Sequence, residues 1–216
     1  MIKFKLYFRK SGFKKDLESA NLLLDQIYKN RPKNFLEVGV FQGVTARNVC
    51  EVLKEIYQNE FKYIGIDLFS SSNLLFDNKE KTLKHSKISN PFKNFYFNFL
   101  KKENLNSKKA VSRLLKKFNN NISLYEGYSD KILNSIDISY IDMVFLDGGH
   151  SYETVKKDLK ILITKLKKNK IIICDDYNQK DYGVKRAVDE FKSEYKIEMV
   201  NERIAKILTW KLCPEV

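Results

Sequence analysis

The sequence predicts an α/β protein in which a mostly parallel sheet is covered by helices on both faces. Short apolar runs rich in Ile, Val, Phe and Leu alternate along the chain with longer amphipathic segments. These runs are apolar at nearly every position, which is typical of parallel strands buried on both sides. No internal repeat or Pro/Gly/Ser-rich linker divides the 216 residues. We therefore expect a single domain with a substantial core.

The predicted elements alternate in order after an N-terminal helical segment. Apolar residues at helical spacing predict a helix over residues 17–29, within a helical segment 1–33. The expected strands cover residues 34–40, 62–69, 121–128, 142–149, 170–177, 195–200 and 204–210, and the expected helices cover 44–58, 151–167 and 182–191. Ligands of such sheets bind beyond the carboxyl ends of the strands, so we expect a site in the loops that follow them.

Residues 71–120 interrupt this alternation. They contain twelve Lys or Arg against three Asp or Glu, together with many Phe residues. A structureless loop of this length is unusual inside a compact domain, so we expect helices here. The helical insert is either a lid over the site or a peripheral extension packed on the core. Its positively charged residues either form a solvated surface or help to attract an anionic acceptor.

The composition argues against several protein classes. A net charge of +13 would suit a protein that binds nucleic acid or an anionic membrane. However, no apolar run approaches the roughly 18 residues that span a bilayer, and the N-terminus lacks the apolar core of a secretory signal. Cys50, Cys174 and Cys213 form no C-x-x-C pair. We interpret them as reduced thiols and expect a cytoplasmic protein.

A glycine-containing motif joins the first strand to its helix. The run "EVGVFQG" spaces Glu37, Gly39 and Gly43 so that backbone can approach a ligand beside a helix N-terminus. Phe41 stands where a dinucleotide fingerprint would have glycine, which disfavours an NAD-dependent oxidoreductase. Asp67 ends the second strand, where a carboxylate can accept the protons of ribose hydroxyls. By itself the motif is equally consistent with a structural tight turn.

Three aspartates follow the fourth and fifth predicted strands. Asp147 ends "MVFLD", and Asp175 and Asp176 end "IIICDD". Three ionised carboxylates this close would repel one another unless a cation neutralised them, and oxygen ligands favour Mg²⁺. The alternative is a turn in which one aspartate caps the next segment. His150 lies three residues after Asp147 and is either a proton acceptor or a structural histidine.

Residues 34–70 and 122–191 resemble a known family. The runs "FLEVGVFQGVTA", "YIGIDLF", "FLDGGHSYETVKKDL" and "IIICDDY" look like those of the Rossmann-like, class I S-adenosylmethionine-dependent methyltransferases. They are most similar to the macrocin O-methyltransferase type and the related D-G-x-H-x-Y branch. The resemblance implies a doubly wound, seven-stranded sheet, mostly parallel with an antiparallel last strand.

The resemblance also implies roles for individual residues. It assigns Glu37, Gly39 and Gly43 to the methionine part of the cofactor, Asp67 to its ribose, Ser129 to its adenine, and Asp147, Asp175 and Asp176 to the metal. For Ser129 the alternative is a helix cap.

The predicted function is Mg²⁺-assisted, S-adenosylmethionine-dependent O-methylation of a small-molecule or sugar acceptor. A hydroxyl must lose its proton to become a good nucleophile, and Asp147 or His150 would accept that proton. One alternative is a nucleic-acid methyltransferase, but the chain has no Asn-Pro-Pro-Tyr motif and no RNA-binding module. The other alternative is a catalytically silent cofactor-binding subunit. A homo-oligomer is compatible with the sequence.

Overall fold

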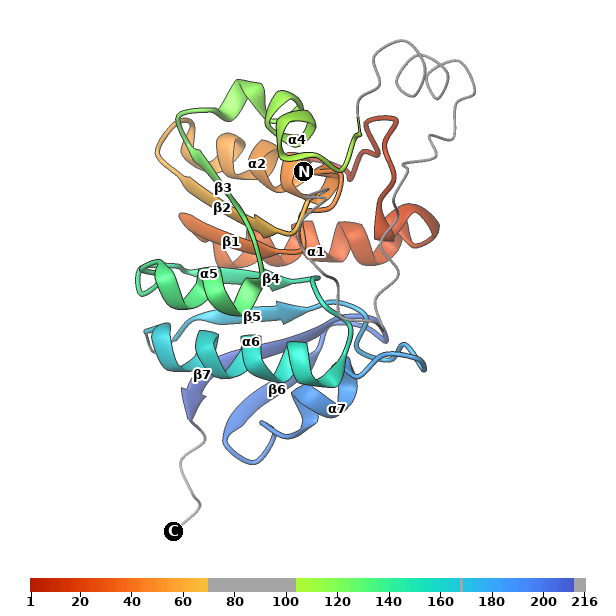
Figure 1. The fold of residues 1–216 in the computed structure, drawn as a ribbon, viewed down its shortest axis with the longest axis vertical. Helices are drawn as coiled ribbons and strands as arrows, with labels where there is room; N and C mark the ends of the chain where they lie inside the picture. Colours follow the sequence, from red (N-terminus) through yellow and green to blue (C-terminus); the bar gives the residue numbers. More distant parts are fainter. Residues whose placement is uncertain (70–103, 168, 212–216) are drawn as a thin grey trace.

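A seven-stranded sheet forms the centre of the protein (Figure 1). The computed structural model describes residues 1–69, 104–167 and 169–211. The strands are β1 (Asn34–Val38), β2 (Lys62–Asp67), β3 (Ile122–Glu126), β4 (Met143–Leu146), β5 (Ile171–Cys174), β6 (Tyr195–Met199) and β7 (Ala205–Lys211). Their order in the sheet is β3-β2-β1-β4-β5-β7-β6. Among the described strands, β7 runs in the direction opposite to the others and pairs antiparallel with β5 and β6, which confirms the predicted fold class.

The strand order reverses at β1, which pairs with β2 on one side and β4 on the other. The chain therefore leaves β1 toward one face of the sheet and β4 toward the other, and ligands of such sheets bind where the order reverses in this way. The predicted cofactor motif follows β1, and Asp147 follows β4. The topology thus brings the two halves of the predicted site to the same place.

Helices cover both faces of the sheet. They are α1 (Leu17–Asn30), α2 (Val44–Tyr57), α4 (Lys108–Leu114), α5 (Ser129–Ser135), α6 (Tyr152–Lys165) and α7 (Val184–Asp189), with short 3-10 turns η1 (Gly12–Lys15) and η3 (Lys116–Phe118). Phe35 belongs to the core that β1 shares with α1 and α2, whereas Leu36 belongs to the core shared with α5, α6 and α7. Because successive side chains point to opposite faces, both faces of β1 must be apolar.

The helices begin in two different ways. Asp16 caps α1 by accepting a hydrogen bond from the Ser19 amide at 3.0 Å, and Ser151 caps α6 by accepting one from the Thr154 amide at 3.3 Å. In contrast, α2 begins after Gly43, which has φ 75° and supplies no side-chain cap. The first N–H groups of α2 thus have no capping side chain.

The strands of the site are shorter than the sequence predicts. Strand β4 ends at Leu146 and β5 at Cys174, so the three aspartates lie in loops and not in the sheet. The chain leaves the sheet because two glycines follow Asp147, and because Asp176 adopts φ 55°. The predicted N-terminal helical segment is also shorter, since its helical part begins at Gly12.

Residues 1–11 run along α2. The Lys5 amide and carbonyl both bond the buried side chain of Asn48, each at 2.8 Å. Hydrogen bonds to a side chain of α2 thus hold this segment in a non-helical path, which turns at Tyr7 and Phe8.

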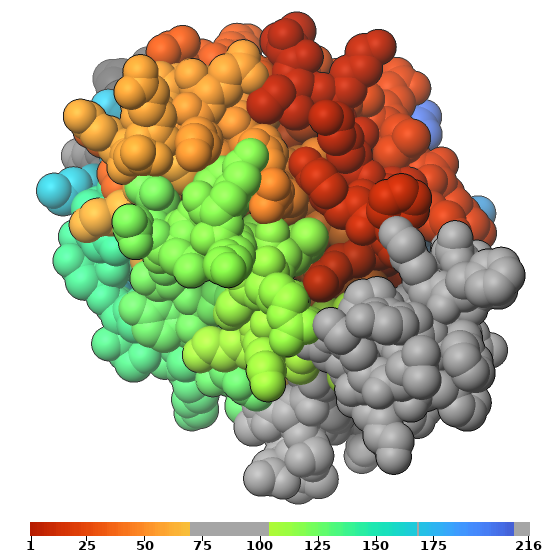
Figure 2. Space-filling view, turned by 90° about the horizontal axis from the view of Figure 1, so that it is seen from above, coloured from red at the N-terminus to blue at the C-terminus, as the bar shows by residue number. Residues whose placement is uncertain are grey.

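The described part of the predicted insert is α4 and η3. Val111, Leu115 and Phe118 are buried in the core on the α2 side of the sheet. Figure 2 shows this segment beside α2 and the N-terminal residues. Residues 70–103, on which the predicted lid falls, lie outside the described residues. Within the described ranges, no helix has the length and apolarity needed to cross a membrane.

Candidate active site

The loop after β1 lies directly against the loop after β4. Gly39 has φ 94°, and a Cβ atom built there would lie 2.0 Å from the Asp147 carbonyl oxygen. Only glycine permits both this backbone conformation and this close approach. Gly43 has φ 75°, and a Cβ atom there would lie 2.9 Å from the Val111 side chain of α4. The glycines therefore join the predicted cofactor loop to Asp147 on one side and to α4 on the other.

Glu37 is a fully buried carboxyl within β1. Its Oε2 accepts a hydrogen bond of 2.8 Å from the Tyr63 hydroxyl. Within the described residues, its buried Oε1 has no hydrogen-bond partner. Burial raises the pKa of Glu37 to about 8, against the lowering effect of the Tyr63 hydrogen bond, and nearby Asp67 raises it further. A buried oxygen without a partner is costly, so this position needs a functional explanation.

Asp67 organises the backbone of the cofactor loop. Its Oδ2 accepts a hydrogen bond from the Phe41 amide at 2.8 Å, and its Oδ1 accepts one from the Phe69 amide at 2.5 Å. Both phenylalanines have positive φ, near 50°. Burial raises the pKa of Asp67 above its ordinary value, against these backbone hydrogen bonds. Each carboxylate oxygen retains a lone pair that can accept a further hydrogen bond.

Ser129 lies apart from this loop, at the start of α5. Its hydroxyl donates a hydrogen bond of 2.9 Å to Oδ1 of the buried Asp158 in α6. The structure therefore gives Ser129 a role in joining α5 to α6. Its predicted contact with adenine remains a prediction.

Three side chains that the sequence analysis missed brace the cofactor loop. Arg9 donates to the carbonyl oxygens of Gln42 (3.0 Å) and Ala110 (3.1 Å). The buried Gln42 donates to Oδ1 of Asn106 at 2.9 Å and accepts from the Lys10 amide at 2.9 Å. The loop is thus tied to the N-terminal segment and to the start of α4. No local motif marks these residues, because their partners are distant in sequence.

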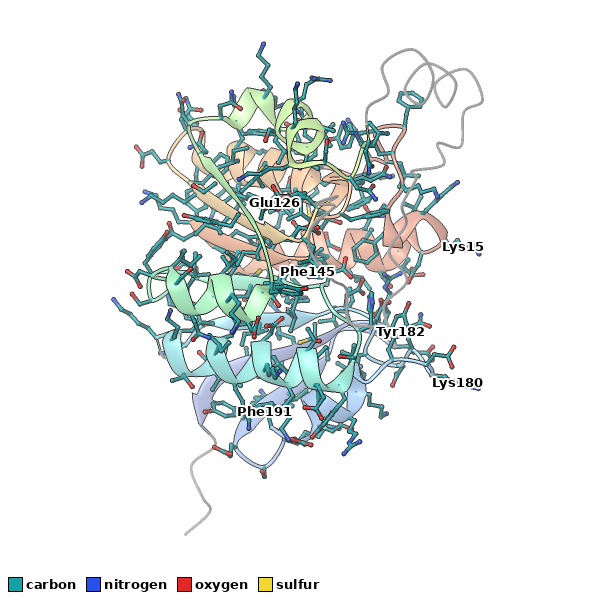
Figure 3. The ribbon with its side chains drawn as sticks, in the orientation of Figure 1. Lys15, Glu126, Phe145, Lys180, Tyr182 and Phe191 are labelled. Atoms are coloured by element: carbon teal, nitrogen blue, oxygen red, sulfur yellow. The ribbon has the colours of Figure 1, made fainter. Side chains whose placement is uncertain are left out.

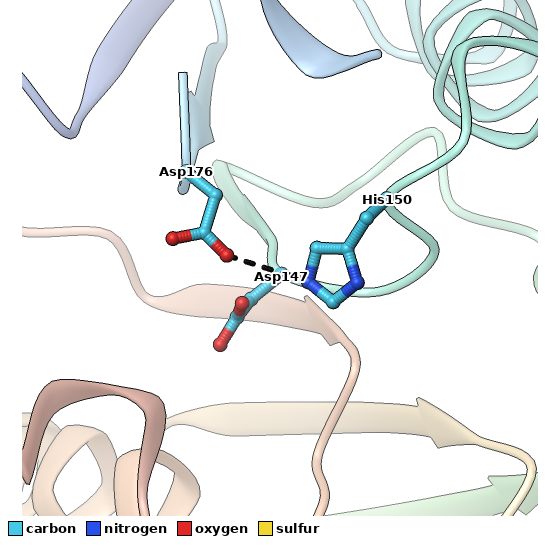
Figure 4. A group of neighbouring side chains, drawn as sticks. All are labelled: Asp147, His150 and Asp176. Carbon is cyan, nitrogen blue, oxygen red and sulfur yellow. Dashed lines mark ion pairs between the residues drawn. The ribbon is translucent and has the colours of Figure 1, made fainter. Parts of the chain in front are cut away.

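Asp147, His150 and Asp176 meet at the acidic edge of the site (Figure 4). One potential ligand atom of each lies within 4.8 Å of the others. Nε2 of His150 is 3.3 Å from Oδ2 of Asp176. Within the described residues, the Asp147 carboxyl has no hydrogen bond or ion pair. Burial raises the pKa of Asp147 well above its ordinary value, and the charges of Asp175 and Asp176 raise it further.

Asp175 is engaged differently from the other two aspartates. Its Oδ1 accepts a hydrogen bond of 2.6 Å from Nε of Arg203, and its Oδ2 accepts one of 2.5 Å from Nη2. Arg203 comes from the turn between β6 and β7, and the sequence analysis missed it. The structure therefore brings Asp147 and Asp176 together with His150, and pairs Asp175 with an arginine. Burial raises the pKa of Asp175 despite the opposing effect of Arg203.

Residues 182 and 183 fix His150 from the other side. The His150 ring stacks on Tyr182 with centroids 4.2 Å apart. The Gly183 amide donates a hydrogen bond of 2.8 Å to the His150 carbonyl oxygen. Figure 3 places Tyr182 at the edge of the sheet, away from the central Phe145. The orientation of His150 is therefore set by the loop after β5.

A small pocket opens between these two loops. It is lined by Leu146, Asp147, Gly148, Gly149, His150, Val155, Asp175 and Val184. Its space is about that of one water molecule, so it can take an ion or a single polar group and not a whole small molecule. The arrangement can hold a cation between carboxylates and an imidazole, and it can accept a proton from a bound hydroxyl.

Comparisons with known proteins fit this geometry. A family model described as "Methyltransferase domain" matches residues 36–177, which are 142 of the 216 residues. A search of the curated proteins finds no match.

Solved structures share the fold at low sequence identity. The O-methyltransferase NovP is 17% identical with a TM-score of 0.62, and the match covers 91% of this chain and 80% of that chain. The calicheamicin methyltransferase CalS11 is 17% identical with a TM-score of 0.60, covering 89% and 80%. The Podospora anserina methyltransferase PaMTH1 is 16% identical with a TM-score of 0.57, covering 89% and 78%. With the family match over the site itself, the chain belongs to the methyltransferase-domain family.

Proposed function

We propose that the protein transfers the methyl group of S-adenosylmethionine to a hydroxyl of a small molecule or sugar, with the help of a divalent cation. The branch we propose is that of the macrocin O-methyltransferase type. One observation carries the proposal most directly: Gly39 of the cofactor loop lies against Asp147 of the acidic edge. A methyl donor held by the first would meet an acceptor held by the second, and methyl transfer depends chiefly on such alignment.

The names of structural neighbours support a hydroxyl acceptor. NovP and the Streptomyces achromogenes protein TomG are described as O-methyltransferases, and the TomG structure is a complex with S-adenosylmethionine. CalS11 is described as a TDP-rhamnose 3'-O-methyltransferase. We propose by analogy that this chain also takes a hydroxyl acceptor, with a sugar among the candidates. Its positive charge is suited to an anionic acceptor.

The residues of the cofactor loop fit S-adenosylmethionine. The buried Oε1 of Glu37 lacks a partner within the described residues and could accept a hydrogen bond from the ammonium group of the methionine part. Asp67 can accept from the ribose hydroxyls while it keeps its backbone partners. When bound, the cofactor supplies a methyl group already activated on sulfonium. The protein need only align it and exclude water.

The acidic edge fits a divalent cation. Asp147 and Asp176 present oxygen ligands, and the half-buried Asp147 carboxyl has no hydrogen bond or ion pair within the described residues. When bound, a cation such as Mg²⁺ would neutralise the clustered carboxylates and lower the pKa of the acceptor hydroxyl. Asp147 or His150 would then accept the hydroxyl proton, since both lie at the pocket.

Calorimetry and a methyl-transfer assay test this proposal. We expect the purified protein to bind S-adenosylmethionine and not NAD, and to methylate hydroxyl acceptors in a panel of nucleotide-linked and free sugars. Chelation should abolish transfer but leave cofactor binding nearly unchanged, and added metal should restore transfer. Full activity in excess chelator would rule out the cation and leave Asp147 or His150 as a metal-free base.

Two further outcomes would replace the proposal. Methylation of tRNA or DNA, with salt-sensitive binding, would identify a nucleic-acid methyltransferase. Cofactor binding without metal binding, and without transfer to any acceptor, would indicate a silent cofactor-binding subunit.

A further inference from the structure

Arg203 is a fixed cation inside the acidic edge. Besides its two bonds to Asp175, its Nη2 lies 3.4 Å from Oδ1 of Asp176 and its Nη1 lies 3.8 Å from Oδ2 of Asp16. The guanidinium carbon lies 4.4 Å from the centroid of the Phe13 ring. The arginine is thus held by two segments, one containing Phe13 and Asp16 and the other Asp175 and Asp176, that are far apart in the sequence. Such a side chain cannot easily swing away when a ligand binds.

This arrangement occupies Asp175. Both of its oxygens accept hydrogen bonds from one guanidinium, in the fork geometry in which arginine binds carboxylates most strongly. The Asp175 side chain is only 1% exposed, and that of Arg203 only 14%. Each oxygen keeps a second lone pair, but a metal ligated by Asp175 would lie against the guanidinium of Arg203, whose positive charge opposes a second cation there.

His150 lies where it could serve as a third metal ligand beside Asp147 and Asp176. Its imidazole offers a nitrogen within 4.8 Å of carboxylate oxygens from Asp147 and Asp176. Stacking on Tyr182 holds the ring in this orientation. The Asp147 carboxyl, which has no hydrogen bond or ion pair within the described part of the chain, completes the set.

We infer that the metal ligands of this protein are Asp147, His150 and Asp176. Arg203 is a positioning residue, which binds Asp175 and so keeps it from serving as a ligand. This inference rests on the proposed metal-assisted function and names its ligands and metal class. Mg²⁺ prefers oxygen ligands, whereas first-row transition metals bind imidazole well. A set of two carboxylates and one imidazole therefore selects a transition-metal dication such as Mn²⁺ over Mg²⁺.

Metal titrations of the cofactor-free protein test the inference without an activity assay. With Mn²⁺ binding followed by electron paramagnetic resonance, and Mg²⁺ by competition, wild type should bind Mn²⁺ at least about tenfold more tightly than Mg²⁺. His150→Ala should weaken Mn²⁺ binding by about tenfold or more and Mg²⁺ binding by less than about threefold. His85→Ala removes the other histidine of the chain for comparison, and a loss of Mn²⁺ affinity as large as that of His150→Ala would contradict the assignment to His150.

A charge-neutral double variant separates Arg203 from the ligands. Asp175→Asn with Arg203→Gln replaces the ion pair by an amide pair, so the net charge of the site is unchanged. Mn²⁺ affinity should then stay within about threefold of wild type. A loss of tenfold or more in this variant, with His150→Ala unaffected, would overturn the inference and make Asp175 the ligand.

Nuclear magnetic resonance gives a readout that does not depend on a substitution in the site. In His85→Gln protein, His150 is the sole histidine, and Mn²⁺ should broaden its ring signals at substoichiometric amounts. Unbroadened signals at saturating Mn²⁺ would contradict the inference. Absence of any metal binding would also overturn it, while S-adenosylmethionine binding and methyl transfer in chelator would still support the methyltransferase function.

Discussion

The two halves of the candidate site are built in different ways. The cofactor loop is mostly backbone: Asp67 accepts hydrogen bonds from the amides of Phe41 and Phe69, and Gly39 and Gly43 supply conformations that other residues rarely adopt. The acidic edge is mostly side chains, drawn from the loops after β4 and β5 and from the β6–β7 turn. The half that is built from backbone can be predicted from a short sequence motif. The half that is built from side chains cannot, because it depends on which distant residues the fold brings together.

The halves meet closely at Gly39, so one substitution there should damage both. We expect Gly39→Ala to destabilise the protein by about 3 kcal/mol or more, because the residue has φ 94° and its Cβ would collide with the Asp147 carbonyl. Chemical denaturation would measure this. Gly148→Ala is the matched control, since its Cβ would meet only a Val38 methyl at 3.0 Å. Equal stability of the two variants would show that the contact is loose.

The cofactor half should respond to pH through Glu37. Its carboxyl has an ordinary pKa of 4.5 and a folded pKa of about 8, raised mainly by burial. Between these values the folded state keeps a proton that the unfolded state has released, so stability falls as the pH rises. Relative to Glu37→Gln, the cofactor-free wild type should lose on the order of a few kcal/mol across this window. Parallel pH–stability curves for the two proteins would contradict this result.

Asp67→Ala should affect the cofactor half alone. Removing a carboxylate that binds ribose should weaken S-adenosylmethionine binding by about 1–3 kcal/mol. Mn²⁺ affinity should be unchanged, because the carboxyl belongs to the other half. Calorimetry with S-adenosylmethionine and with Mn²⁺ measures the two effects separately. Asp67→Asn is the conservative variant, and its one carbonyl oxygen can keep only one of the two backbone hydrogen bonds. Equal cofactor binding by wild type and Asp67→Ala would disprove the ribose assignment.

Ser129→Ala should have the smallest effect. The substitution removes a hydrogen bond to the buried Asp158 and should cost about 1 kcal/mol of stability. If the hydroxyl serves only to join α5 and α6, cofactor affinity will not change. If S-adenosylmethionine affinity instead falls by more than the loss of stability can explain, the result would support the predicted adenine contact.

Much of the fold could be predicted from the sequence. The strand and helix order follows from apolar runs that alternate with amphipathic segments, and the antiparallel last strand follows from the family resemblance. Strand ends were less accurate. Apolar periodicity continues to Asp147 and Asp175, but the following glycines and the positive φ of Asp176 take the chain out of the sheet. Such turns depend on contacts with neighbouring loops.

The sequence by itself determined the fold class, the glycine-containing cofactor loop and the presence of carboxylates at the ends of β4 and β5. Each of these depends on residues that lie close together in the chain. Only the tertiary structure decided the partners of those carboxylates. It paired Asp175 with Arg203, turned His150 toward Asp176, and tied Gln42 to Arg9. Side-chain charges act through space, and nothing in the short turn that carries Arg203 marks this residue as the partner of a carboxylate until folding brings the two together.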